Sequence, residues 1–237
     1  ISLIQPGGRI LDKFKIRISG NTLTMISQAN RNSNWNSRYS LLENFDINTG
    51  ELLGSLELAE RETLYATRFE GDFAYIVTFR RVDPLFIVDL QDPSNPLLLS
   101  ELIVPGWSEY LEVLDNQLFA VGVENSQVTA SLFDVSDKAN PFLSQRIYMG
   151  NENEYTWSEA NYDEKAIGKV SSHGLFFIPY QTWLNGKQEN KLQILRHSNQ
   201  ELKKGGQISH RVEARRSVTD STGTLPFGFM ARNSGCF

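Results

Sequence analysis

The chain has 237 residues, of which 40% are hydrophobic and 22% are charged. This composition is typical of one large or two small folded domains, and it excludes a disordered or collagen-like chain. The formal net charge is -5, so the chain lacks the basic excess of a phosphate-binding surface, and we expect no nucleic-acid partner. Its apolar runs, such as residues 175–179, are too short for a membrane span.

Strand pairs are predicted along the chain wherever apolar residues alternate around a turn signal. In chain order they are residues 14–25 around Gly20-Asn21, 65–79 around Gly71-Asp72, 111–121 around Asp115-Asn116, and 166–178 around His173-Gly174. Each is followed by a second strand, turn and strand, at residues 45–56, 86–100, 132–144 and 192–208. We therefore predict an all-β fold made of units with four antiparallel strands.

A repeat of about 45 residues relates these units. Segment 86–100 recurs 45 positions later at four polar or proline positions, Asp89, Asp92, Asn95 and Pro96. The same form occurs 43 residues upstream, and a degenerate fourth copy follows after about 60 residues. Four-stranded units at this spacing are typical of β-propeller blades. The alternative is a β-sandwich, which would need fewer repeats in register.

The predicted blades are residues 10–58, 64–103, 109–148 and 160–209, as part of a larger ring, with another blade starting at 212–218. Residues 219–237 have no hydrophobic period, and we interpret them as an aberrant, poorly ordered tail. An unfinished blade leaves an open sheet edge, which favours self-association with another chain. Because the chain begins at Ile1 without a leader pattern, we expect a processed product or an excerpt of a longer protein.

Linear motifs for catalysis or metal binding are missing from the sequence. The repeated Asp, Asn and Pro residues are interpreted as turn formers, since Asp and Asn bond nearby backbone amides and Pro fixes φ. The three histidines, His173, His197 and His210, have no ligand partner at a metal-binding spacing, and Cys236 is the single cysteine. We predict no cofactor, no metal and no catalytic residue, and we favour a protein that is not an enzyme.

Three segments are distinctive: Asp92-Pro-Ser-Asn-Pro96, Val104-Pro-Gly-Trp-Ser-Glu-Tyr-Leu111 and Ser131-Leu-Phe-Asp-Val-Ser-Asp137. With the surrounding residues 64–181, they resemble a prokaryotic family of secreted proteins with a C-terminal β-propeller distantly related to WD40 repeats. The resemblance implies export or display at the cell surface, in proteins longer than this chain. Function in that family is largely undefined, so the resemblance assigns no catalytic residue.

Charge is distributed unevenly. Residues 100–164 carry 12 acidic and 2 basic side chains, whereas residues 165–237 carry 4 acidic and 11 basic ones. Solvated outer strands account for this asymmetry, and steering of a charged partner is the alternative. The acidic residues 152–164 offer oxygen ligands for calcium, but their spacing matches no known calcium loop.

The tryptophans suggest a binding surface. In a four-stranded blade, the second turn and the link to the next blade lie at the same end. We place Trp35 and Trp183 in second turns, and Trp107 and Trp157 in links, with Tyr155 beside Trp157. These residues predict one loop face that binds a protein or a polysaccharide, since long loops and Trp are enriched at recognition sites. The alternative is that the rings pack between blades.

The sequence thus predicts a secreted or surface-displayed β-propeller that serves as a binding or scaffold module. One alternative is a propeller-type hydrolase or lyase, whose site would lie at the central channel and combine carboxylates from several blades. The other alternative is a structural spacer of the cell envelope.

Overall fold

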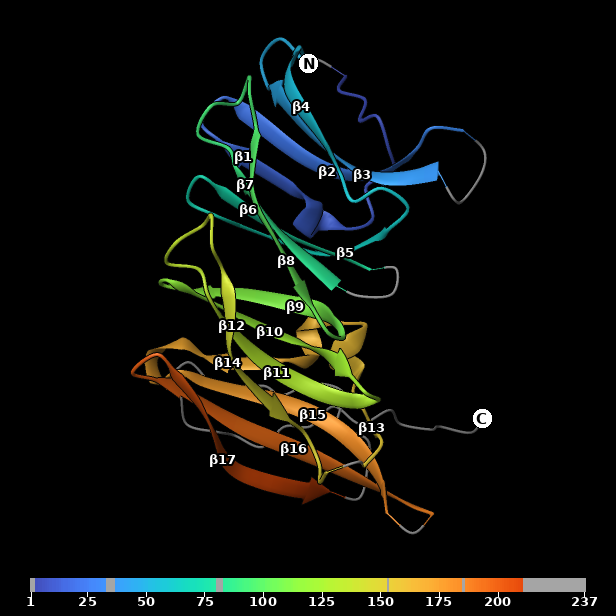
Figure 1. Cartoon of the computed structure of the whole chain (residues 1–237), viewed down its shortest axis with the longest axis vertical. Coiled ribbons are helices and arrows are strands. Elements are labelled where there is room, and N and C mark those ends of the chain that lie inside the picture. Colours follow the sequence, from blue (N-terminus) through green and yellow to red (C-terminus); the bar gives the residue numbers. More distant parts are fainter. Residues whose placement is uncertain (1–2, 33–36, 80–82, 153, 185, 211–237) are drawn as a thin grey trace, which may run out of the picture. The chain divides into compact units, whose positions relative to one another are not determined.

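The computed structural model describes residues 3–32, 37–79, 83–152, 154–184 and 186–210. Within these ranges the chain forms four antiparallel sheets, which confirms the predicted all-β fold (Figure 1). No helix in the same ranges has the length and apolar character of a membrane span. The predicted start of another blade at 212–218 and the tail at 219–237 lie outside the described residues.

The strands follow one another within each sheet. The first sheet contains β1 (Ile16–Ser19), β2 (Thr22–Asn30), β3 (Arg38–Asp46) and β4 (Leu52–Leu58), and the second contains β5 (Thr63–Glu70), β6 (Phe73–Phe79), β7 (Asp83–Asp89) and β8 (Leu97–Val104). The third contains β9 (Trp107–Leu114), β10 (Gln117–Glu124), β11 (Gln127–Asp134) and β12 (Phe142–Tyr148). The fourth contains β13 (Thr156–Trp157), β15 (Leu175–Leu184), β16 (Lys187–Ser198) and β17 (Glu201–His210), and β14 (Gly168–Val170) also pairs with β15.

The predicted turn signals lie between paired strands. Gly20 has φ 56° between β1 and β2, and Gly71 has φ 52° between β5 and β6. Asp115 adopts φ 52° between β9 and β10. Left-handed φ values fit the tight turns whose twist matches that of the flanking strands, and Gly, Asn and Asp tolerate them best.

The fourth sheet differs from the prediction of a simple strand pair at residues 166–178, because two short strands, β13 and β14, both pair with the long strand β15. β15 has ten residues, and β14 pairs only with its first part, at Leu175 to Phe177. The remaining backbone pairs with β13, where Trp157 lies opposite Gln181. The placement of Trp157 in a link was therefore wrong, since it belongs to a strand. Ala166, predicted in a strand, lies in a 3-10 turn (Glu164–Ala166, η4).

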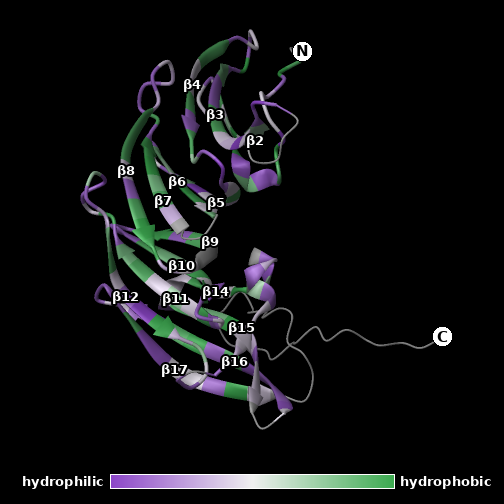
Figure 2. Cartoon of the chain, turned by 45° about the vertical axis from the view of Figure 1, so that its right-hand side comes forward, coloured by the Kyte–Doolittle hydropathy of each residue, from purple (hydrophilic) through white to green (hydrophobic). Residues whose placement is uncertain are grey.

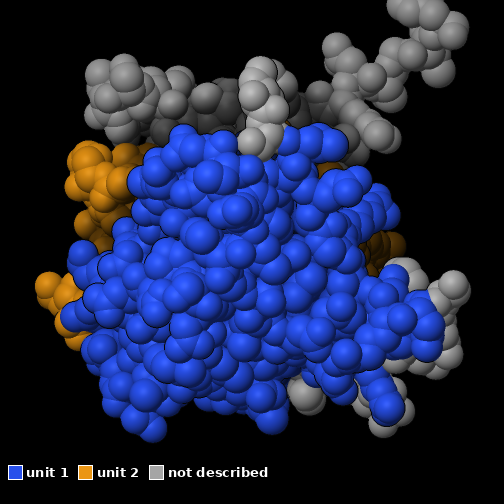
Figure 3. All heavy atoms as spheres, turned by 90° about the horizontal axis from the view of Figure 1, so that it is seen from above, with its two compact units in different colours: residues 1–107, 111–116, 135–142 blue, residues 108–110, 117–134, 143–237 orange. Residues whose placement is uncertain are grey.

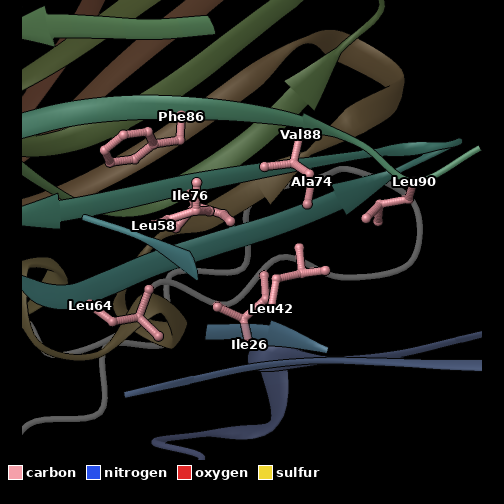
Figure 4. Close-up of a cluster of buried hydrophobic side chains, with 9 residues drawn as sticks. All are labelled: Ile26, Leu42, Leu58, Leu64, Ala74, Ile76, Phe86, Val88 and Leu90. Atoms are coloured by element: carbon pink, nitrogen blue, oxygen red, sulfur yellow. The ribbon is translucent and has the colours of Figure 1, made fainter. Parts of the chain in front are cut away.

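The chain divides into two compact units, which Figure 3 colours separately. Unit 1 comprises residues 1–107, 111–116 and 135–142, and unit 2 comprises 108–110, 117–134 and 143–237. In unit 1, buried apolar side chains of the first two sheets form one cluster (Figure 4), which contains Ile26, Leu42, Leu58, Leu64, Ala74, Ile76, Phe86, Val88 and Leu90. Burial of such side chains is the main stabilising term of the unit.

Unit 2 is held together by apolar residues on both faces of β15. Phe176 stacks on Phe119 of β10 with ring centroids 4.1 Å apart, and both rings are buried. Phe177, the next residue, points to the opposite face and packs with Val170 and Leu192. Figure 2 shows hydrophobic positions along β10 and β11, in contrast to the largely hydrophilic β17.

The repeated Asp residues are turn formers, as predicted. Asp92 Oδ1 accepts a hydrogen bond from the Ser94 amide at 2.9 Å, and Asp137 Oδ1 accepts one from the Ala139 amide, also at 2.9 Å. For Asp92, hydrogen bonds from the Ser94 side chain and backbone hold the pKa of the carboxyl below its usual value. The Asn140 side chain and the Ala139 amide lower the pKa of Asp137 in the same way.

These turns also contact the preceding sheet within unit 1. Asn44 of β3 donates from Nδ2 to the Pro93 carbonyl at 3.0 Å, and a Cβ on Gly54 of β4 would lie 2.6 Å from the same oxygen. At the equivalent place one sheet later, Ser100 Oγ of β8 donates to the Lys138 carbonyl at 2.8 Å. The repeat therefore encodes a sheet-to-sheet contact as well as a turn.

Candidate functional site

The predicted binding residues are brought together in part. Trp35 lies outside the described residues, and Trp107 is the first residue of β9. The other three, Tyr155, Trp157 and Trp183, lie close together in unit 2. A single face carrying all four tryptophans, and its use in binding, stay predictions.

Strand register places three rings on one side of the fourth sheet. Thr156 pairs with Thr182, and Trp157 with Gln181, so Tyr155 stands opposite Trp183. The rings of Tyr155 and Trp183 have centroids 5.2 Å apart at a 55° tilt, and they are 52% and 38% exposed. Because side chains alternate along a strand, Trp157 projects to the same side as Tyr155.

A fourth ring, Tyr162, completes this surface. It stacks on Trp157 with centroids 6.1 Å apart and planes 30° apart, and it is 71% exposed. The sequence places Tyr162 in the acidic insertion, but its spacing of five from Trp157 suits neither a strand nor a helix. Only the 3-10 turn between them, η3 (Glu159–Asn161), brings the two rings together. We call Tyr155, Trp157, Tyr162 and Trp183 the aromatic patch.

Buried hydrogen bonds fix the backbone beneath the aromatic patch. Ser158 is fully buried, and its hydroxyl accepts from the Ala160 amide at 3.0 Å and donates to the Pro179 carbonyl at 2.5 Å. The first bond caps η3 and the second ties it to β15. A rigid backbone reduces the conformational entropy that the rings would lose on binding a ligand.

Two of the histidines make side-chain hydrogen-bond contacts outside the aromatic patch. Within the described part of the chain, no group of three or more His, Cys, Asp and Glu side chains is arranged to hold a metal ion. His197 Nε2 lies 2.8 Å from Gln117 Oε1, and His173 Nδ1 lies 2.9 Å from the Ser172 hydroxyl. What the patch offers chemically is apolar ring faces with hydroxyl and indole groups at their edges.

A model of the beta propeller domain matches residues 5–226. An uncharacterized protein of Archaeoglobus fulgidus is 38% identical over 173 residues, which are 73% of this chain and 26% of that protein. An uncharacterized protein of Methanocaldococcus jannaschii is 31% identical over 208 residues, 78% of this chain and 32% of that protein. The chain thus spans only about a quarter to a third of these relatives.

Solved structures support the same fold. A functionally unknown protein from Desulfotomaculum acetoxidans has a TM-score of 0.52 at 9% identity, over 88% of this chain and 62% of that one. A hypothetical selenium-binding protein from Sulfolobus tokodaii has a TM-score of 0.53 at 11% identity, over 80% of this chain and 52% of that one. At such identities the likeness concerns the fold alone. The repeat, the four sheets and the match over residues 5–226 establish that this chain belongs to the beta propeller domain family.

Proposed function

We propose that the chain is a binding module of an exported β-propeller protein, without enzymatic activity, and that its aromatic patch binds a polysaccharide. The observation that carries the proposal is the grouping of Tyr155, Trp157, Tyr162 and Trp183 on one side of the fourth sheet, with three of the rings more than a third exposed. Exposed aromatic groups of this size are characteristic of interaction sites in soluble proteins.

The arrangement of the rings favours a polymer of sugar rings over a protein partner. Tyr155 with Trp183, and Trp157 with Tyr162, make two pairs, and Tyr155 and Trp157 are two residues apart in the extended chain at β13. Two residues of a strand span about 7 Å, so the pairs could contact successive apolar sugar faces. A stable protein interface buries about 800 Å² on each partner, with a wide apolar centre. Four rings alone fall short of that area.

Export is part of the same proposal. It is supported by the resemblance of segments 92–96, 104–111 and 131–137 to the secreted family described above. The test is fractionation of cells that make this protein from its own gene, followed by protease treatment of intact cells. We expect the propeller to be degraded from outside. Protection until the cells are lysed would contradict export.

The polysaccharide proposal is tested by screening the chain against immobilised glycans and then titrating the best ligand. Tyr155→Ala and Trp183→Ala each remove one half of a ring pair, so we expect affinity to fall about 5- to 10-fold, equivalent to about 1 to 1.4 kcal/mol. Phe142→Ala is the matched control, because Phe142 is 54% exposed and lies in β12, outside the patch.

Equal affinity of the wild type and both patch variants would refute the patch as the glycan site. A protein captured only through Tyr155 and Trp183, with no glycan bound, would replace the polysaccharide by a protein partner. Circular dichroism of each variant ensures that a loss of affinity is not a loss of fold.

A further inference from the structure

Unit 2 contains a second candidate site, a cleft between β12 of the third sheet and β17 of the fourth. Its volume is about 730 Å³, within the range of small-molecule sites, and its walls include Asn125, Tyr148, Asn151 and Lys204. A smaller cavity of about 240 Å³ adjoins it and shares Asn151 and Lys204, together with Gly150. None of these residues belongs to the aromatic patch.

Side-chain amides hold both walls of the cleft in place. Gln145 of β12 donates from Nε2 to the Leu202 carbonyl at 2.5 Å and accepts from the Leu202 amide at 2.8 Å. On the other wall, Gln127 Nε2 donates to the Asn151 carbonyl at 2.7 Å, and the Asn151 amide donates to Glu154 Oε2, also at 2.7 Å. The cleft is therefore preformed, which lowers the entropic cost of binding.

Gly150, which lines both cavities, allows a tight turn in this wall. Its φ of 79° is unfavourable for other residues, and a Cβ there would lie 2.8 Å from Glu154 Oε2 and 2.9 Å from Thr156 Cγ2. The chain can thus turn tightly at the point where the two cavities meet.

The charges around the cavities leave one ammonium group unneutralised. Arg146 pairs with Glu124 at 2.8 Å, Lys203 with Glu201 at 2.7 Å, and Lys191 with Glu189 at 3.1 Å. Lys204 has no carboxylate within ion-pair distance among the described residues, and it lines both cavities.

Lys191 and Lys204 both line the smaller cavity, and none of its lining residues carries a carboxylate. Glu154 and Glu189 lie just behind this lining, where Glu189 pairs with Lys191, so Lys204 is the cation that remains for a ligand. Tyr180 lies there too, and burial raises its pKa to about 12, so its hydroxyl stays neutral and can donate a hydrogen bond. This end of the site therefore suits a negatively charged group.

The larger cavity has a different chemistry. The side-chain amides of Asn125 and Asn151 line this cavity, and Asn151 also contacts Glu154. A side-chain amide has two donor and two acceptor positions, so each can still bond a hydroxyl. The ring of Tyr148 is 37% exposed and offers an apolar face. Glu152 is the one carboxylate among the residues that line the larger cavity, and it does not line the smaller one.

We propose that this double cavity binds an acidic sugar. The carboxylate lies in the smaller cavity beside Lys204 and Lys191, and the hydroxylated ring lies in the larger one, against Tyr148 and between the two asparagines. The inference deepens the proposed function, since it assigns an acidic class to the sugar, but it depends on residues outside the aromatic patch.

The test is calorimetric titration of the full chain with a trimer of galacturonic acid, with a neutral galactose trimer as comparison. We expect the acidic trimer to bind at least 10-fold more tightly. Lys204→Met should weaken it about 10- to 100-fold, the usual effect of removing a charge-assisted hydrogen bond. Lys187→Met is the matched control, because Lys187 is an exposed lysine at the far end of β16 and outside both cavities.

Equal binding of the two trimers, or full affinity of a folded Lys204→Met variant, would overturn the assignment. Binding of a hexaglutamate peptide through Lys204, without binding of the acidic trimer, would overturn the assignment of a sugar and show that the ligand is an acidic peptide. Loss of binding in Tyr155→Ala but not in Lys204→Met would refute the cleft and retain the aromatic patch. The reverse pattern would retain the cleft and refute the patch.

Discussion

Gly54→Ala tests whether the repeated turn supports the contact between the first two sheets. Gly54 lies in β4, and a Cβ on this residue would be 2.6 Å from the Pro93 carbonyl oxygen and 2.5 Å from that of Ser94. Both oxygens are backbone atoms of a turn that Asp92 fixes by two hydrogen bonds to Ser94. The added methyl group therefore cannot be accommodated by a change of rotamer.

Two effects of the substitution oppose each other. Overpacking against backbone costs about 1 to 3 kcal/mol. Replacing Gly by Ala also restricts the unfolded chain, which stabilises the folded state by about 0.4 to 1 kcal/mol where the backbone conformation permits. We expect overpacking to dominate, with a net loss of about 1 to 2 kcal/mol. For a chain of this size that corresponds to a fall in Tm of about 2 to 8 °C.

The assay is thermal unfolding followed by circular dichroism, with Gly206→Ala as the control. Gly206 lies in β17, and a Cβ there would meet only the flexible end of Ile194, at 3.7 Å. The control should unfold within about 1 °C of the wild type, since exposed substitutions without new contacts are close to neutral. If Gly54→Ala is as stable as the control, the turn does not pack against β4 as described.

Three further predictions concern other contacts. Phe119→Ala removes a buried ring that stacks between the third and fourth sheets of unit 2, and it should lower the free energy of unfolding by about 3 to 5 kcal/mol in urea titrations. Asp92 and Asp137 have lowered pKa values in the folded chain, so their contribution to stability is complete above the unfolded pKa of about 3.9 and is lost as the pH falls through the lower, folded pKa. Replacing both by Asn should therefore reduce the fall in urea midpoint between pH 5 and pH 3. An unchanged fall would contradict this. Gln145→Leu leaves the Leu202 amide and carbonyl without their side-chain partner, so we expect a loss of about 1 to 3 kcal/mol and faster hydrogen exchange at the Leu202 amide, whereas unchanged exchange would show that this bond is unimportant.

Local signals account for the part of the fold that the sequence predicts. Residues such as Gly20, Gly71 and Asp115 lie in turns that need a positive φ, and apolar alternation on either side determines which strands pair. The Asx turns at Asp92 and Asp137 are local as well, since each carboxylate bonds an amide two residues later. Such features can be read from a short window of sequence.

Contacts between distant residues explain what the sequence does not predict. The sequence predicts a link at Trp157, whereas the structure has a strand there. The strand forms because β15 is long enough to pair with both β13 and β14, and the sequence around Trp157 does not indicate this length. Tyr162 reaches Trp157 only through η3. The cleft depends on Gln145 and Leu202, which are 57 residues apart. No periodicity in the sequence reports a contact of that kind.

The alternation of side chains along β15 explains why one strand contributes to two separate candidate sites. Tyr180 lines the smaller cavity, and Trp183, three residues later, belongs to the aromatic patch on the opposite face. Ten consecutive residues of β15 pair with β16, from Leu175 opposite Arg196 to Leu184 opposite Lys187. A slip of one residue would exchange the two faces, moving Tyr180 out of the cavity and Trp183 away from Tyr155. The buried stack of Phe176 on Phe119 opposes such a slip, so the hydrophobic packing of unit 2 also fixes the positions of both candidate sites.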